Sequence, residues 1–124
     1  MPDGAAKAER FTARVLIGAA LYGVIGSASL YFTDAPDPHR LLYFAFAGIA
    51  LVFQGVFVVI ARDPRRFAPL LGLCVFEKIS FAIPALAFFA QGQAPLSMGL
   101  GGAMDMLLAV LFAICWRKML QTTP

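Results

Sequence analysis

Charged residues are scarce in this chain of 124 residues: only 14% are charged, whereas 60% are hydrophobic. Soluble domains carry about 25% charged residues. Five stretches contain no charged residue at all, namely 15–33, 41–61, 67–76, 79–104 and 106–116. So little polar surface cannot cover a soluble globule, and the composition therefore excludes an ordinary soluble domain.

Cysteine and histidine are also rare, with two Cys and one His. Cys74 and Cys115 lie too far apart in the sequence to form a CxxC pair, which counts against a thiol oxidoreductase. No serine is followed or preceded closely by a histidine, so a hydrolase triad is not indicated. The sequence therefore favours a protein that is not an enzyme, and we expect neither a cofactor nor a metal site.

The uncharged stretches predict four transmembrane helices in one domain, residues 1–124, because about 20 apolar residues cross a bilayer. The expected spans are about 12–32, 41–61, 70–91 and 97–116. They form an all-α integral membrane four-helix bundle with up-down-up-down topology. Residues 1–10 are small and polar, and we expect a frayed tail there. A cleaved signal peptide is the alternative for the first span, although its apolar run exceeds the usual length of about 7–15 residues.

Lysine and arginine are unevenly distributed between the two sides of this topology. One side carries Lys7, Arg10, Arg14, Arg62, Arg65, Arg66, Arg117 and Lys118. The two connections on the other side contain only Arg40. The positive-inside rule therefore predicts that both termini are cytoplasmic in a bacterial inner (plasma) membrane. Because the basic residues flank apolar spans, they indicate the lipid bilayer as their partner rather than nucleic acid.

Three ionisable residues interrupt the last two spans: Glu77, Lys78 and Asp105. A charge at the centre of a membrane costs at least about 2.5–3.5 kcal/mol. From the helical rise, Glu77 lies about 10 Å, Lys78 about 12 Å and Asp105 about 16 Å from the cytoplasmic boundary. Gln54 and Tyr22, in the second and first spans, fall near the depth of Glu77. These five residues form one polar layer and are the candidates for a ligand or proton site.

Within this layer we expect Lys78 to pair with Asp105 across the third and fourth helices. Adjacent residues of a helix point about 100° apart, so Glu77 is not expected to face Lys78. One carboxyl group is then left over, and we expect Glu77 to be protonated and hydrogen-bonded to Gln54 or Tyr22. The alternative is that Glu77 and Lys78 extend to the cytoplasmic interface, leaving Asp105 as a lone helix-packing acid.

Small residues mark two places where helices can approach closely. Gly101 and Gly102 lie one turn before Asp105 on the fourth helix, on the side expected to meet the third. Ala19 and Gly23 have small-xxx-small spacing on the first helix. The small residues of the first helix exceed what a slim monomer needs, so we expect a homodimer or a complex with another membrane protein.

Four short motifs resemble small four-helix bacterial membrane proteins, and the general build is similar to DoxX-like proteins. They are Arg-Asp-Pro-x-Arg-Phe at 62–67, Glu-Lys at 77–78, Asp105 and Trp-Arg at 116–117. The resemblance covers most of the chain and implies a four-helix membrane fold, but it brings no activity with it. Small multidrug transporters share the size and the four spans. They carry their key Glu in the first helix, whereas residues 12–32 contain no acid.

Three functions compete on these observations. The favoured one is a non-enzymatic, membrane-embedded interaction or accessory protein whose polar layer holds the helices together. The alternative is a proton-coupled transporter or a binder of a small lipophilic molecule that uses Glu77 or Asp105. A membrane enzyme acting on a lipophilic substrate is less favoured, because no histidine accompanies the acids. A void that reaches Glu77 or Asp105 would distinguish the last two functions from the first.

Overall fold

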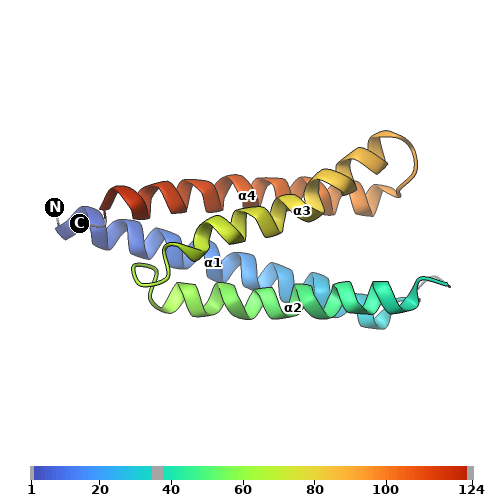
Figure 1. Cartoon of the computed structure of the whole chain (residues 1–124), viewed down its shortest axis with the longest axis horizontal. Helices are drawn as coiled ribbons and strands as arrows, with labels where there is room; N and C mark the ends of the chain where they lie inside the picture. The colour runs from blue at the N-terminus through green and yellow to red at the C-terminus, as the bar shows by residue number, and fades with distance from the viewer. Residues whose placement is uncertain (1, 35–37, 123–124) are drawn as a thin grey trace.

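Four long helices make up the computed structural model, which describes residues 2–34 and 38–122. They are α1 (Pro2–Ser29), α2 (Arg40–Arg62), α3 (Leu70–Ala90) and α4 (Leu96–Thr122), with a short 3-10 helix η1 (Leu30–Phe32) after α1. The helices run alternately in opposite directions along one long axis (Figure 1). Each is long and apolar enough to cross a membrane. The all-helical, four-helix architecture is therefore confirmed.

The first and last helices are longer than the sequence predicts. α1 begins at Pro2, so the expectation of a frayed tail is wrong for residues 2–10. α4 continues to Thr122 instead of ending near Trp116. Ala8 and Met119, which lie in these extensions, belong to the same buried core cluster and are only 6% and 1% exposed. Tertiary packing, rather than helix propensity, thus stabilises both ends.

The helices form two hairpins, α1–α2 and α3–α4, which join mainly along α1 and α4 (Figure 1). Each helix contributes a fully buried side chain where they meet: Leu16, Phe57, Leu71 and Phe112. The rings of Phe57 and Phe112 meet edge to face, with centroids 5.1 Å apart. In a membrane such helix association rests on van der Waals packing more than on the hydrophobic effect.

Helices α2 and α3, by contrast, touch at few positions. The rings of Phe46 and Phe81 stack between them, with centroids 5.6 Å apart. Leu42 precedes Phe46 by one turn of α2 and is 70% exposed, while Phe88 follows Phe81 by two turns of α3 and is 50% exposed. Residues at these spacings share a helix face. The bundle is therefore open along these four residues, which we call the α2–α3 face.

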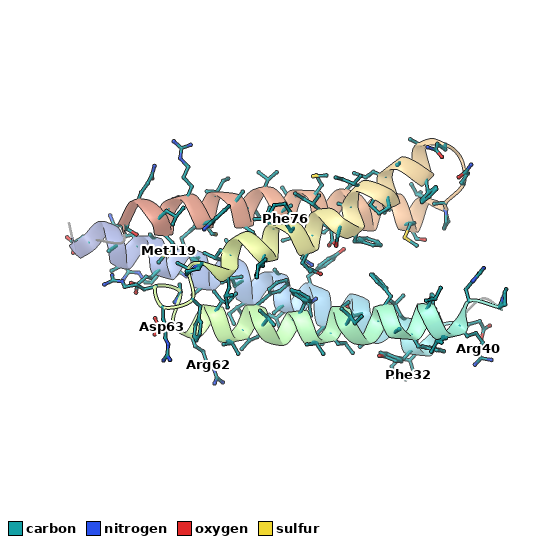
Figure 2. All side chains as sticks on the ribbon, in the orientation of Figure 1. Phe32, Arg40, Arg62, Asp63, Phe76 and Met119 are labelled. Atoms are coloured by element: carbon teal, nitrogen blue, oxygen red, sulfur yellow. The ribbon has the colours of Figure 1, made fainter. Side chains whose placement is uncertain are left out.

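Both termini and the α2–α3 connection lie at one end of the bundle (Figure 1). Arg65 in this connection forms an ion pair with Glu9 of α1, with an N–O distance of 2.7 Å. The connection turns at Asp63, whose carboxylate accepts a hydrogen bond from the backbone N–H of Arg66 at 3.2 Å. Figure 2 shows Arg62 and Asp63 at this end, and Phe32 and Arg40 at the opposite one. The uneven charge distribution of the sequence thus becomes a difference between the two ends of the bundle.

Helices α3 and α4 approach closely at Gly102. A Cβ atom added there would lie 2.9 Å from the Ala85 Cβ and 3.3 Å from the backbone nitrogen of Leu86. At Gly101 a Cβ would lie 3.6 Å from the Phe81 ring, which is an ordinary contact. Only one member of the predicted glycine pair is therefore required for the close approach.

Two of the small residues of α1, Ala19 and Gly23, are used inside the chain. Ala19 is 2% exposed, and a Cβ atom at Gly23 would overlap the side-chain amide of Gln54 on α2. The expectation that this face is surplus to the monomer is therefore wrong at Ala19 and Gly23. Gly18 and Gly26 of the same helix are exposed and have open space beside them.

Candidate functional site

Lys78 of α3 lies at the centre of a charged cluster. Its ammonium nitrogen is 3.6 Å from Asp105 Oδ1 on α4 and 3.6 Å from Glu77 Oε2. The predicted pairing of Lys78 with Asp105 is thus present. The expectation that Glu77 would not face Lys78 is wrong. Although the two side chains leave the helix in different directions, both are long enough to curve toward the same point.

The ammonium group of Lys78 is enclosed on a third side by α2. It lies 5.2 Å from the centroid of the Phe57 ring, a distance at which a cation is attracted to the ring face. Lys78 is only 3% exposed, so it does not extend to a membrane interface. This one side chain therefore links α3 to both α4 and α2.

Glu77 lacks the hydrogen bonds predicted for it. Its Oε2 atom is buried and has no hydrogen-bond partner among the described residues. Gln54 donates instead to the carbonyl oxygen of Ala50, at 2.7 Å within its own helix, and its Oε1 atom is also buried without a partner. Tyr22 is 42% exposed on α1 and lies within electrostatic range of Asp105, but no hydrogen bond joins it to Glu77. The expected bond from Glu77 to Gln54 or Tyr22 is therefore absent.

The polar layer is thus divided into two parts. Glu77, Lys78 and Asp105 form the charged cluster between α3 and α4. Gln54 lies between α1 and α2, where its side chain fills the space above Gly23. A similar depth along four helices predicted one layer, but the rotation of each helix decides which of these groups meet.

The charged cluster contains two carboxyl groups and one ammonium group. With all three ionised it carries one excess negative charge, and a buried charge without a partner is costly. The cluster can therefore take up one further positive charge, either a proton or a small cation. Glu77 Oε2 is the atom with a free hydrogen-bonding position for it.

Two hollows in the surface lie at the ends of the bundle and not beside this cluster. One, of about 430 Å³, lies among Phe32, Asp34, Arg40 and their neighbours. The other, of about 350 Å³, lies between the first turns of α1 and the last turns of α4. Neither is lined by Glu77 or Asp105, whose side chains are 17% and 13% exposed. These two hollows therefore do not provide a void that reaches the carboxyl groups.

Two features of the site have no clear signal in the sequence. In the sequence Phe57 is one of many apolar residues of its span, and only the tertiary structure places its ring beside Lys78. The hollow between α1 and α4 depends on helical structure at residues predicted to be a tail.

Among the described side chains, the charged cluster is held together by ion pairs. In residues 2–34 and 38–122, no three His, Cys, Asp or Glu side chains gather where they could hold a metal ion. Cys74 and Cys115 are both buried free thiols.

Comparisons with protein-family models, with curated proteins and with solved structures found no match to this chain.

Proposed function

We propose that this chain is a non-enzymatic integral membrane protein that acts as an interaction or accessory protein by helix packing. The observation that carries the proposal is the enclosure of Lys78, whose ammonium is held by Asp105, Glu77 and the Phe57 ring. A cluster that satisfies a buried ammonium from two neighbouring helices serves to hold those helices together. Neither of the two hollows at the ends of the bundle is lined by this cluster.

The α2–α3 face is the side on which a partner helix would pack. α1 and α4 each have extensive contacts with two neighbouring helices, whereas α2 and α3 each have extensive contacts with only one. A helix of a second copy, or of another membrane protein, would supply the missing neighbour at Leu42 and Phe88. The partner would thereby complete the packing that the monomer leaves open between its two hairpins.

Photo-crosslinking in native membranes tests this proposal. A photoreactive amino acid replacing Leu42 or Phe88 should give one discrete protein adduct, because these side chains would lie against the partner helix. The matched control is Leu107 of α4, which is 53% exposed, close to the 50% of Phe88. An adduct of twice the chain mass identifies a second copy, and another discrete mass identifies a different protein. Lipid adducts alone at Leu42 and Phe88 would contradict the proposal.

We further propose that the protein lies in a bacterial inner membrane with both termini in the cytoplasm. The support is the shared end of the bundle, which holds the basic residues of α1, of the α2–α3 connection and of the end of α4. Arginine and lysine near the ends of membrane helices are strongly biased toward the cytoplasmic side.

Cysteine labelling of intact cells tests this orientation. Gln93→Cys, in the α3–α4 turn, should react with a membrane-impermeant maleimide from outside. Arg65→Cys, in the α2–α3 connection, should react only after the membrane is permeabilised, because the two positions lie at opposite ends of the bundle. The native Cys74 and Cys115 are buried and provide a low background. Labelling of Arg65→Cys in intact cells would reverse the orientation.

A second function is favoured by the buried Oε2 atom of Glu77, which makes no hydrogen bond although it lies 3.6 Å from the Lys78 ammonium. A carboxyl group that lacks a hydrogen-bond donor, in a cluster with excess negative charge, is suited to accept a proton or the positive centre of a lipophilic cation. The chain would then be a proton-coupled transporter or a binder of a small lipophilic molecule. The variant Glu77→Gln separates this function from a purely structural role.

A further inference from the structure

The hollow between the start of α1 and the end of α4 is lined by cationic and neutral side chains only. Its volume is about 350 Å³, and the charged residues that line it are Lys7 and Lys118. Phe11 and Ala8 supply apolar surface, and Gln121 and Thr122 supply polar groups. A concave site with two ammonium groups and no carboxylate in its lining is suited to an anion.

Neither lysine has an acidic partner in the described part of the chain. The nearby Glu9 pairs with Arg65, at 2.7 Å. Asp3 precedes Lys7 by one turn of α1, but no ion pair joins them. The ammonium of Lys118 lies 4.5 Å from the centroid of the Phe11 ring, and this contact holds it beside the hollow. Both positive charges are therefore available to a ligand.

The hollow lies where the apolar spans of α1 and α4 begin and end, which is the level of lipid headgroups in a bilayer. Phe11, which lines the hollow, is 37% exposed and offers apolar surface to an acyl chain. We propose that this hollow binds the phosphate group of an anionic phospholipid, with Lys7 and Lys118 contacting the phosphate oxygens. The adjoining apolar helix surface selects a lipid over free phosphate.

Native mass spectrometry of the full chain in detergent tests this site with phosphatidylglycerol as the probe. The wild type should retain one phosphatidylglycerol, and phosphatidylcholine should bind far less. Each lysine that contacts the phosphate should contribute about tenfold, as a hydrogen bond to a charged group does. Lys7→Gln combined with Lys118→Gln should therefore weaken binding roughly a hundredfold. Replacing both lysines with arginine should retain it, because guanidinium groups also bind phosphate.

The matched control is Arg14→Gln combined with Arg117→Gln. It removes the same number of charges from the same two helices, but neither arginine lines the hollow. Lipid retention in this control should change less than about twofold, since only diffuse surface charge is lost. Equal losses in the two double variants would overturn the proposal, as would equal binding of phosphatidylcholine. Displacement of the lipid by millimolar inorganic phosphate would assign the site to free phosphate instead.

Discussion

Lys78→Met is expected to lower the free energy of unfolding by about 3–5 kcal/mol, the cost of stranding a buried charge. The ammonium of Lys78 lies 3.6 Å from both carboxyl groups of the cluster, so its removal leaves Glu77 and Asp105 facing each other without a cation. Asp105→Asn should lower the free energy of unfolding by less than Lys78→Met does, because Glu77 remains as a partner for the ammonium. The measurement is unfolding of the purified protein in mixed detergent micelles, followed by circular dichroism.

The double variant Lys78→Met/Asp105→Asn separates an ion pair from two independent contributions. If the two residues interact, the double variant should be more stable than Lys78→Met alone, because one stranded carboxylate has been neutralised. We expect a coupling free energy of about 0.5–3 kcal/mol, which is the range for residues in direct contact. Additive effects would show that the two residues stabilise the bundle independently.

Glu77→Gln completes the test of the cluster. It removes the excess carboxyl group and leaves Lys78 with Asp105, so the free energy of unfolding should change by less than about 1 kcal/mol. Wild type and variant can then be compared for binding of tetraphenylphosphonium, a lipophilic cation, in reconstituted vesicles. Loss of binding in a folded Glu77→Gln protein would favour the ligand-binding function over a structural role. Absence of binding in the wild type as well would favour the structural one.

Gly102→Ala is expected to lower the free energy of unfolding by about 1–3 kcal/mol, the usual range for overpacking a close contact. The added methyl group would lie 2.9 Å from the Ala85 Cβ and 3.3 Å from a backbone atom of α3. Because neither neighbour is the flexible end of a side chain, the helices have to move apart. That movement would also weaken the contact between Lys78 and Asp105, one turn away.

Gly101→Ala is the matched control for this variant. Its added methyl group meets only the Phe81 ring, at 3.6 Å, and alanine has a higher helix propensity than glycine. The variant should therefore be as stable as the wild type, or more stable by up to about 1 kcal/mol. Thermal unfolding of both variants in the same detergent measures the difference. Equal destabilisation by both substitutions would contradict the close packing at Gly102.

The existence of four helices and their approximate limits in the middle of the chain follow from the sequence alone. A long uncharged stretch can satisfy its backbone polar groups in a bilayer only by forming a helix or a closed barrel. The α2 and α3 limits, Arg40–Arg62 and Leu70–Ala90, fall within one or two residues of the predicted spans. The outer limits of α1 and α4 did not follow from the sequence. Residues 1–10 are polar enough to suggest a tail, and residues 117–122 follow the end of the apolar run, yet both segments are helical and contact each other.

The pairing of Lys78 with Asp105 was predictable because a buried ammonium requires an acid and the neighbouring helix supplies one. The contacts of Glu77 and Gln54 were not predictable, since the depth of a residue along a helix does not specify how the helix is rotated about its axis. Gln54 turns toward Gly23 on α1, and Glu77 turns toward Lys78.

Composition and hydrophobic pattern by themselves determined the all-helical class, the number of helices long and apolar enough to cross a membrane and the concentration of basic residues at one end. These are properties of single segments, set by the cost of placing charges and unpaired backbone groups in an apolar medium. Only the tertiary structure decided which helices pack together, that the α2–α3 face is open and that Lys7 and Lys118 share a hollow. Those features depend on how the segments rotate and pack against one another, which no single segment encodes.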